Sequence, residues 1–172
     1  MALLRELVFW LTGIVILVLL NLAIFEREAI MAEGDTAILA LVPVDPRSLI
    51  QGDYMSLTYE LQRDPALTAA AEERAAAGET HGLLVLAPDE RGIHRFRRLD
   101  DGSLLGPDEL RLIYRWREAR LRLPGRSFFF QEGTGAAYER ARFATFKVGA
   151  EGDAVLVGLR DETLAEIVPT EP

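Results

Sequence analysis

Few side chains in this sequence have the types and spacing that metal binding or catalysis requires. The 172 residues include no cysteine and only two histidines, His81 and His94. These histidines stand 13 residues apart, and no His-Glu-x-x-His pattern or similar ligand spacing surrounds them. Thiol catalysis and cysteine-ligated metals are therefore excluded, and the sequence predicts no metal site and no cofactor.

Two sets of side chains leave a membrane-anchored hydrolase open as an alternative. Asp53 and Glu132 could act as a general acid and base if the fold brings them together. Ser48 precedes a Gly-Asp pair, a superficial likeness to type I signal peptidases, in which a lysine activates a serine nucleophile. Lys147 is the only lysine of the chain. It stands 99 residues after Ser48, and the Ser-Met-x-Pro pattern of those peptidases is absent, so an enzyme is the less favoured interpretation.

Arginines are concentrated in one part of the chain. Residues 91–126 contain ten arginines and five acidic residues, a net charge of +5, whereas the whole chain carries −8. Most of these arginines lie in predicted strands. They could form a face that binds an anionic lipid or a small ligand, or they could pair with acidic side chains across neighbouring strands. The acidic balance of the whole chain disfavours a nucleic-acid partner.

An uncharged run near the amino terminus predicts a membrane anchor. Residues 7–25 contain no charged side chain, and these 19 residues, at about 1.5 Å each, match the ~30 Å core of a bilayer. A cleaved signal peptide would have a shorter apolar region and a small-x-small cleavage site, so we expect a retained transmembrane helix. Arg5 precedes the run and several acidic residues follow it. This distribution favours residues 1–6 in the cytoplasm and the remaining domain in the periplasm or outside the cell.

The rest of the chain is predicted to form one β-rich domain. We expect a stalk at 26–35, the domain at 36–168 and a disordered tail at 169–172. A helix should follow Asp64, because an acidic N-cap, a first-turn proline and a terminal glycine mark its ends. About seven strands and two helices are predicted, with connections too short for regular helical crossovers. The expected fold is α+β, a mostly antiparallel β extracytoplasmic domain preceded by one transmembrane helix.

The segment Gly52–Tyr59 is predicted to be a strand that continues to about Leu61. Side chains alternate along an extended chain. One face would carry Asp53, Met55, Leu57 and Tyr59, and the other Tyr54, Ser56 and Thr58. We therefore expect Leu57 and Tyr59 in the core and Tyr54 on the side that is open to a ligand or partner.

This segment reads G-D-Y-x-x-L-x-Y, carried by Gly52, Asp53, Tyr54, Leu57 and Tyr59, and it resembles the signature of the GDYxxLxY domain family of bacterial proteins. The likeness extends to the proline-containing run 43–47, to the upstream membrane segment and to the stretch 130–139. The resemblance implies a single-pass protein of the bacterial inner membrane, because members of the family are typically membrane-anchored. It also implies a multipass membrane protein as partner, since members are often encoded near such proteins. It implies no established activity.

The sequence combines a membrane anchor with a β-rich domain and contains no recognisable set of catalytic residues. These features favour a binding or assembly component of a membrane protein complex. The alternatives are the hydrolase or Ser-Lys peptidase and a module that binds an anionic lipid or a small ligand. The residues that we expect at a binding site are Arg47, Asp53, Tyr54, Glu132 and Tyr138. Their convergence around one cleft would support a binding site or an enzyme.

Overall fold

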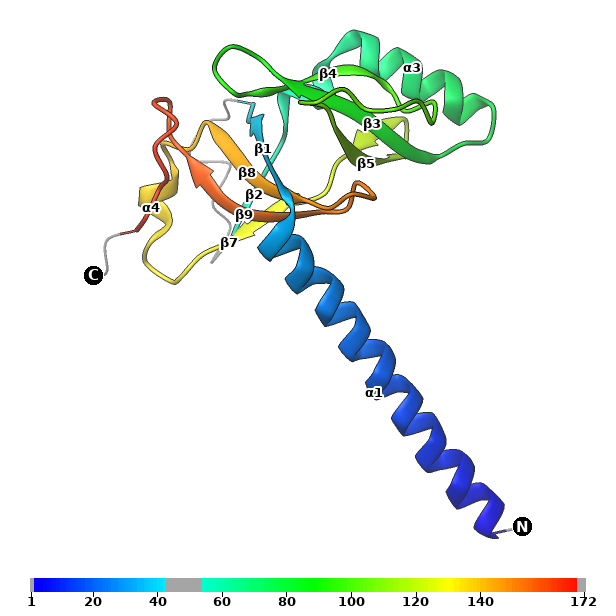
Figure 1. Ribbon diagram of the computed structural model, residues 1–172. Helices are drawn as coiled ribbons and strands as arrows, with labels where there is room; N and C mark the ends of the chain where they lie inside the picture. Colours follow the sequence, from blue (N-terminus) through cyan, green and yellow to red (C-terminus); the bar gives the residue numbers. More distant parts are fainter. Residues whose placement is uncertain (1, 43–53, 170–172) are drawn as a thin grey trace.

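The computed structural model describes residues 2–42 and 54–169, which form a long helix that leads into a β-rich domain (Figure 1). Helix α1 (Ala2–Glu33) runs without a break for 32 residues. It is long and apolar enough to cross a membrane, and no part of its apolar stretch is buried against the domain. The apolar run 7–25 and the charged residues 26–33 thus belong to one helix.

The junction between α1 and the domain is tightly built around Gly34. Its amide donates to the carbonyl oxygen of Ile30 at 3.0 Å, and its own carbonyl oxygen accepts from Lys147 Nζ at 2.9 Å. A Cβ atom at Gly34 would stand 2.4 Å from the Ile30 oxygen and 2.9 Å from the carbonyl oxygen of Val148. These contacts tie the end of the helix to the sheet.

Within the described residues, nine strands form three sheets, and every strand pair is antiparallel. The first sheet has the order β1-β8-β9, the second is β2-β7, and the third has the order β4-β3-β5-β6. The strands are β1 (Asp35–Ala40), β2 (Tyr54–Ser56), β3 (His81–Pro88), β4 (His94–Leu99), β5 (Leu110–Arg117), β6 (Arg120–Arg122), β7 (Ser127–Phe129), β8 (Phe143–Val148) and β9 (Ala154–Arg160). The helices in the described part of the domain are η1 (Glu60–Arg63), α3 (Pro65–Ala76) and α4 (Gly135–Tyr138). The prediction of an α+β domain with mostly antiparallel strands is confirmed.

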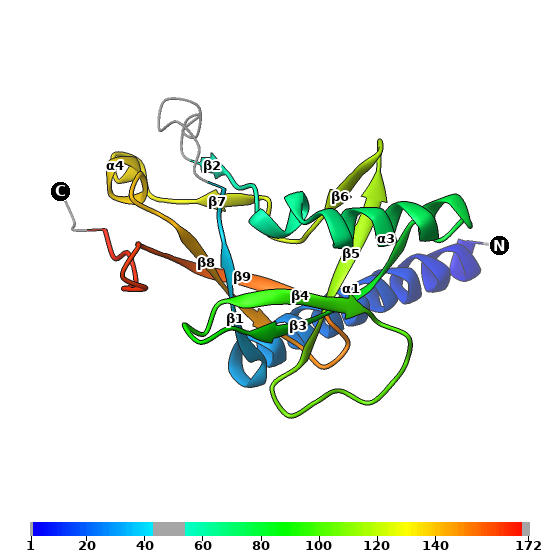
Figure 2. The same cartoon turned by 90° about the horizontal axis from the view of Figure 1, so that it is seen from above.

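Helix α3 follows the local signals of the sequence. The Asp64 carboxylate accepts from the amides of Ala66 and Leu67, and Pro65 occupies the first turn, where its missing N–H costs nothing. Leu67 and Ala71 are the buried side chains of this helix, and they belong to the main core. Figures 1 and 2 show α3 running alongside the four-stranded sheet.

Strand β5 alternates between buried and more open side chains. Leu110, Leu112 and Tyr114 are buried in the same core as Leu67 of α3. The intervening side chains point to the other face. At the edge of β5, the amide of Ile113 donates to the carbonyl oxygen of Gly152 in the β8–β9 turn at 2.9 Å. The arginines of β5 therefore stand on the side of the sheet that α3 does not cover.

The strand predicted for Gly52–Leu61 is shorter than expected. Its described part, β2, ends at Ser56, and Tyr59 forms only an isolated bridge with Leu41 before η1 begins. The prediction of a strand to Leu61 is wrong because the Gln62 side-chain oxygen accepts from the Tyr59 amide at 2.9 Å and turns the chain into a 3₁₀ helix.

The predicted alternation of side chains in this segment is confirmed over its described part. Met55, Leu57 and Tyr59 are buried core residues. Tyr54 is half-buried, whereas Ser56 and Thr58 are exposed. Gly52 and Asp53 lie outside the described residues, as do the run 43–47 and the chain end 170–172.

Candidate functional site

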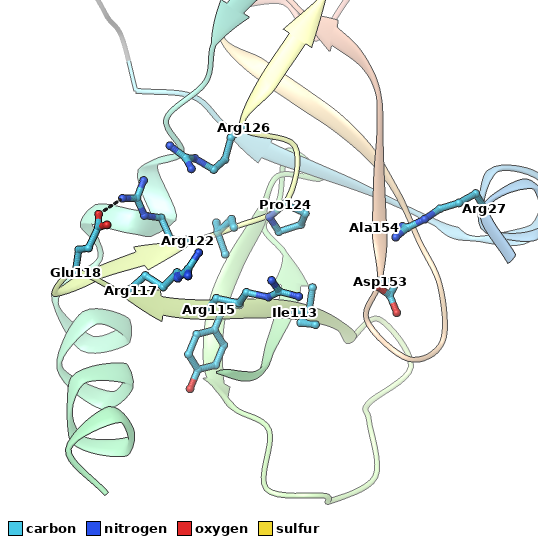
Figure 3. Close-up of a pocket in the computed structure, with 12 residues that line it drawn as sticks. Arg27, Ile113, Arg115, Arg117, Glu118, Arg122, Pro124, Arg126, Asp153 and Ala154 are labelled. Carbon is cyan, nitrogen blue, oxygen red and sulfur yellow. Dashed lines mark hydrogen bonds and ion pairs between the residues drawn. The ribbon is translucent and has the colours of Figure 1, made fainter. Parts of the chain in front are cut away.

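Five arginines from four segments line a cavity of about 430 Å³ (Figure 3), which we call the arginine cavity. Arg27 comes from α1, Arg115 and Arg117 from β5, Arg122 from β6, and Arg126 from the connection between β6 and β7. The other lining residues are Ile113, Tyr114, Glu118, Leu123, Pro124, Asp153 and Ala154. Five cationic and two acidic side chains give this lining a positive charge in a chain of net charge −8.

The β5–β6 hairpin places like charges directly opposite each other. Arg115 pairs with Arg122 across the two strands, and Arg117 pairs with Arg120. Opposed like charges on neighbouring strands repel and destabilise a sheet. Arg122 is partly neutralised by Glu118, whose Oε2 lies 3.0 Å from Arg122 Nη2 (Figure 3). The hairpin thus concentrates positive charge at a cost to its own stability.

Four of the five arginines of the cavity have no ion pair or side-chain hydrogen bond with any other residue that the structure describes. They are Arg27, Arg115, Arg117 and Arg126, and all four are exposed. Other arginines of the stretch 91–126 pair with acidic side chains instead. Arg95, Arg98 and Arg111 each form ion pairs with Asp or Glu residues. The guanidinium groups in the cavity are therefore available to an external anion.

The two-residue turn of this hairpin is strained. Glu118 and Ala119 have φ angles of 53° and 55°, in the left-handed region. A type I′ hairpin turn requires such angles at both central residues and normally uses Asn or Gly. For other residues the left-handed conformation costs roughly 1–2 kcal/mol each. The turn nonetheless holds Arg115 and Arg122 in register on adjacent strands.

Tyr59 of the signature motif supports the wall of the arginine cavity. Its hydroxyl donates to the carbonyl oxygen of Gly125, and its ring packs against Phe146 with ring centroids 5.7 Å apart. Burial raises the pKa of Tyr59 far above its usual value, so the hydroxyl remains a donor. Gly125 has φ +66°, and a Cβ atom there would stand 2.7 Å from the Phe146 ring, so this position requires glycine.

Two further hydrogen bonds join the segment 57–62, which contains the end of the signature, to the same wall of the cavity. The Leu57 amide donates to the carbonyl oxygen of Arg126 at 2.8 Å. Gln62 Nε2 donates to the carbonyl oxygen of Leu121 at 2.8 Å. The segment 57–62 therefore fixes the backbone on both sides of Leu123 and Pro124, and with it the places of Arg122 and Arg126.

Arg27 completes the cavity from the side of the helix. It lies two residues after the apolar run 7–25. Figure 3 shows its side chain extending from α1 toward Ala154, at the start of β9. The hydrogen bond from Lys147 to the carbonyl oxygen of Gly34 ties the end of α1 to the domain. It thereby helps to fix the position of Arg27 relative to the cavity.

The residues predicted for a binding site do not line this cavity where the structure describes them. Tyr54 lies opposite Phe129 in the β2–β7 pair, with ring centroids 5.7 Å apart. Glu132 is exposed in the turn before α4. Tyr138 is buried in an aromatic cluster with Phe128 and Phe130.

Arg47 and Asp53 lie outside the described residues, so the predicted set is seen only in part. The sequence contained a signal for the cavity in the excess of arginines between residues 91 and 126. It contained none for the contributions of Arg27 or of the motif segment, because these depend on the tertiary fold.

The arginine cavity offers hydrogen-bond donors with fixed positive charge. Guanidinium groups bind phosphate and carboxylate through paired N–H donors. No serine, histidine or lysine is among the described lining residues. Lys147, the proposed base of the peptidase alternative, donates to Gly34, and Ser48 lies outside the described residues. The chemistry that this lining supports is the binding of an anion.

The two histidines do not come together. His81 is exposed on β3, whereas His94 is buried on β4 and its Nδ1 accepts from the Ile38 amide at 3.2 Å. Within the part of the chain that the structure describes, no group of three His, Cys, Asp or Glu side chains could hold a metal ion. His94 instead links β4 to β1.

Comparison with known proteins identifies the family of the chain. A family model described as GDYXXLXY protein matches residues 16–159. This range covers most of the chain and contains the signature segment and every residue of the arginine cavity. Neither a curated protein nor a solved structure matches the chain.

Proposed function

The chain belongs to the GDYXXLXY family, and we propose that it is a membrane-anchored binding protein whose domain holds an anionic group in the arginine cavity. The observation that carries this proposal is the juxtaposition of Arg115 and Arg122 across β5–β6, together with three other arginines on the same cavity. A bound anion would offset the repulsion that this arrangement creates.

The membrane location rests on α1. Its apolar run supports an anchor, and the position of Arg5 before this run supports residues 1–6 in the cytoplasm. In this orientation, the domain 36–168 would face the periplasm of a bacterium, attached to the inner membrane. Fusion of a reporter enzyme to either end of α1 tests the orientation.

Anion binding is tested with the full chain in a non-ionic detergent. Titration with pyrophosphate, followed by calorimetry, should give saturable binding that weakens as salt is added. Arg115→Gln combined with Arg117→Gln should weaken this binding by about tenfold or more. Arg97→Gln is the matched control, because Arg97 is an exposed arginine on β4 outside the cavity. Equal binding by all three proteins would overturn the proposal.

A second candidate function, assembly with a multipass membrane protein, is favoured by the exposed aromatic pair of the β2–β7 ribbon. Phe129 is 74 % exposed and lies against the half-buried Tyr54. Aromatic side chains of this kind are enriched at protein interfaces. In gentle detergent, Phe129→Ser should release a membrane partner that co-purifies with the wild type, whereas Val168→Ser, also at an exposed apolar residue, should retain it.

A further inference from the structure

The arginine cavity lies beside the point at which α1 is expected to leave the membrane. Arg27 is two residues beyond Phe25, the last residue of the apolar run, which corresponds to about 3 Å along a helix. The polar headgroup layer on each side of the hydrocarbon core is about 5–7 Å thick. The guanidinium of Arg27 is thus at the depth of lipid headgroups if α1 spans the bilayer.

The part of the domain that carries the cavity arginines lies on the side toward which α1 runs. Figure 1 shows α1 descending on the side where β5 and the β8–β9 hairpin lie, and in Figure 2 β5 crosses the line of α1. The uncovered face of β5 carries Arg115 and Arg117, and these residues share the cavity with Arg27. The positive face of the domain is therefore turned toward the surface from which α1 emerges.

We propose that the anion is the phosphate of an anionic lipid headgroup in the leaflet where α1 ends. This inference rests on the proposed function and specifies its ligand. Arg115 and Arg117 on β5, Arg126 on the connecting segment and Arg27 on α1 would offer guanidinium donors to the phosphate from the lining of the cavity. The anchor keeps the cavity at the membrane surface, so the lipid is always at high local concentration.

The lining of the cavity suits a headgroup that is still attached to its lipid. Ile113, Leu123, Pro124 and Ala154 add apolar surface among the arginines. A free phosphate ion would make no use of these side chains, whereas the glycerol and the first methylene groups of a lipid would contact them. The shared chemistry of the two ligands is the phosphate, and the experiment separates them.

The test uses the full chain in two binding measurements. In the first, the protein is purified in detergent with equal amounts of phosphatidylglycerol and phosphatidylcholine, and bound lipids are counted by native mass spectrometry. In the second, pyrophosphate is titrated without lipid. The variants are the Arg115→Gln/Arg117→Gln double variant, Arg27→Gln and the control Arg97→Gln, each checked for a cooperative thermal unfolding transition, which shows that it is folded.

We expect the wild type and Arg97→Gln to retain phosphatidylglycerol over phosphatidylcholine. The double variant should lose this preference by about tenfold or more, and Arg27→Gln should lose part of it. Pyrophosphate that binds in the cavity without any preference for phosphatidylglycerol would overturn the lipid inference and leave the proposed function standing. Absence of both kinds of binding would overturn both. Phosphatidylglycerol bound equally by all variants would show general attraction to the protein surface and would also overturn the inference.

Discussion

The hydroxyl of Tyr59 donates a hydrogen bond to the carbonyl oxygen of Gly125, the residue before Arg126 in the wall of the arginine cavity. Tyr59 is the last residue of the signature segment, and its ring is fully buried. The motif therefore acts on the candidate site from within the core. It holds the connection that carries Arg126 and contributes no lining residue of its own within its described part.

Replacement of Tyr59 by Phe should destabilise the domain and loosen this wall. The ring contact with Phe146 would remain, but the Gly125 carbonyl would lose its donor, which costs about 1–3 kcal/mol for a buried group. Urea unfolding followed by fluorescence measures the loss. Tyr54→Phe is the control, because that side chain is only half-buried and lies on the opposite side of the segment. An unchanged free energy of unfolding in Tyr59→Phe would show that the hydrogen bond contributes nothing.

Replacement of Ala119 by Gly should stabilise the β5–β6 hairpin. Ala119 has φ 55°, and the relief of about 1–2 kcal/mol of strain exceeds the roughly 0.5–1 kcal/mol of added chain entropy. The midpoint of urea unfolding should rise at constant slope. The same substitution at Ala69, an exposed position inside α3, should instead lower the midpoint. A lower midpoint for Ala119→Gly would indicate that the turn is not strained.

The stability of the domain should fall in mild acid because of His94. Burial lowers the pKa of His94 more than the backbone contacts at Gly92 and Ile38 and the carboxylate of Asp89 raise it. The unfolded chain takes up a proton near the ordinary pKa of about 6.5, whereas the folded protein resists this uptake. Stability should therefore be constant above about pH 6.5 and decline as the pH drops toward the lower folded pKa.

Chemical unfolding at a series of pH values measures this decline. His94→Asn should reduce it, since Asn cannot be protonated and can still accept from the Ile38 amide. His81→Gln should keep the decline, because His81 is exposed. A pH profile that His94→Asn leaves unchanged would assign the effect to other groups.

Local chemistry made part of this fold predictable from sequence. The N-cap at Asp64 and the alternation from Tyr54 to Tyr59 depend on neighbours in the chain, and both predictions are confirmed for the described residues. The end of β2 was not predictable, because it depends on a side-chain bond from Gln62. The positive φ angles of Glu118 and Ala119 were not predictable, since neither residue type favours this conformation.

The candidate site was predictable only as a charge imbalance. The stretch 91–126 indicated a positive face, but the cavity also needs Arg27, which the fold brings in from a helix far away in sequence. The expected site residue Tyr138 is a core aromatic beside Phe128 and Phe130. The sequence did not indicate that Tyr138 is buried, because its contacts with Phe128 and Phe130 join α4 to β7 and the residue after it, and these contacts form only in the folded chain.

The most direct test of an anion-binding role is the effect of Arg115→Gln on stability and binding, measured by thermal unfolding of the full chain with and without pyrophosphate. Removal of one of two opposed arginines should stabilise the anion-free protein by a few tenths to about 1 kcal/mol. The same change should reduce the added stability that pyrophosphate confers on the wild type. Opposite signs of these two effects are the predicted result. A variant that is less stable without anion and equally stabilised by it would contradict an anion-binding role for the arginine cavity.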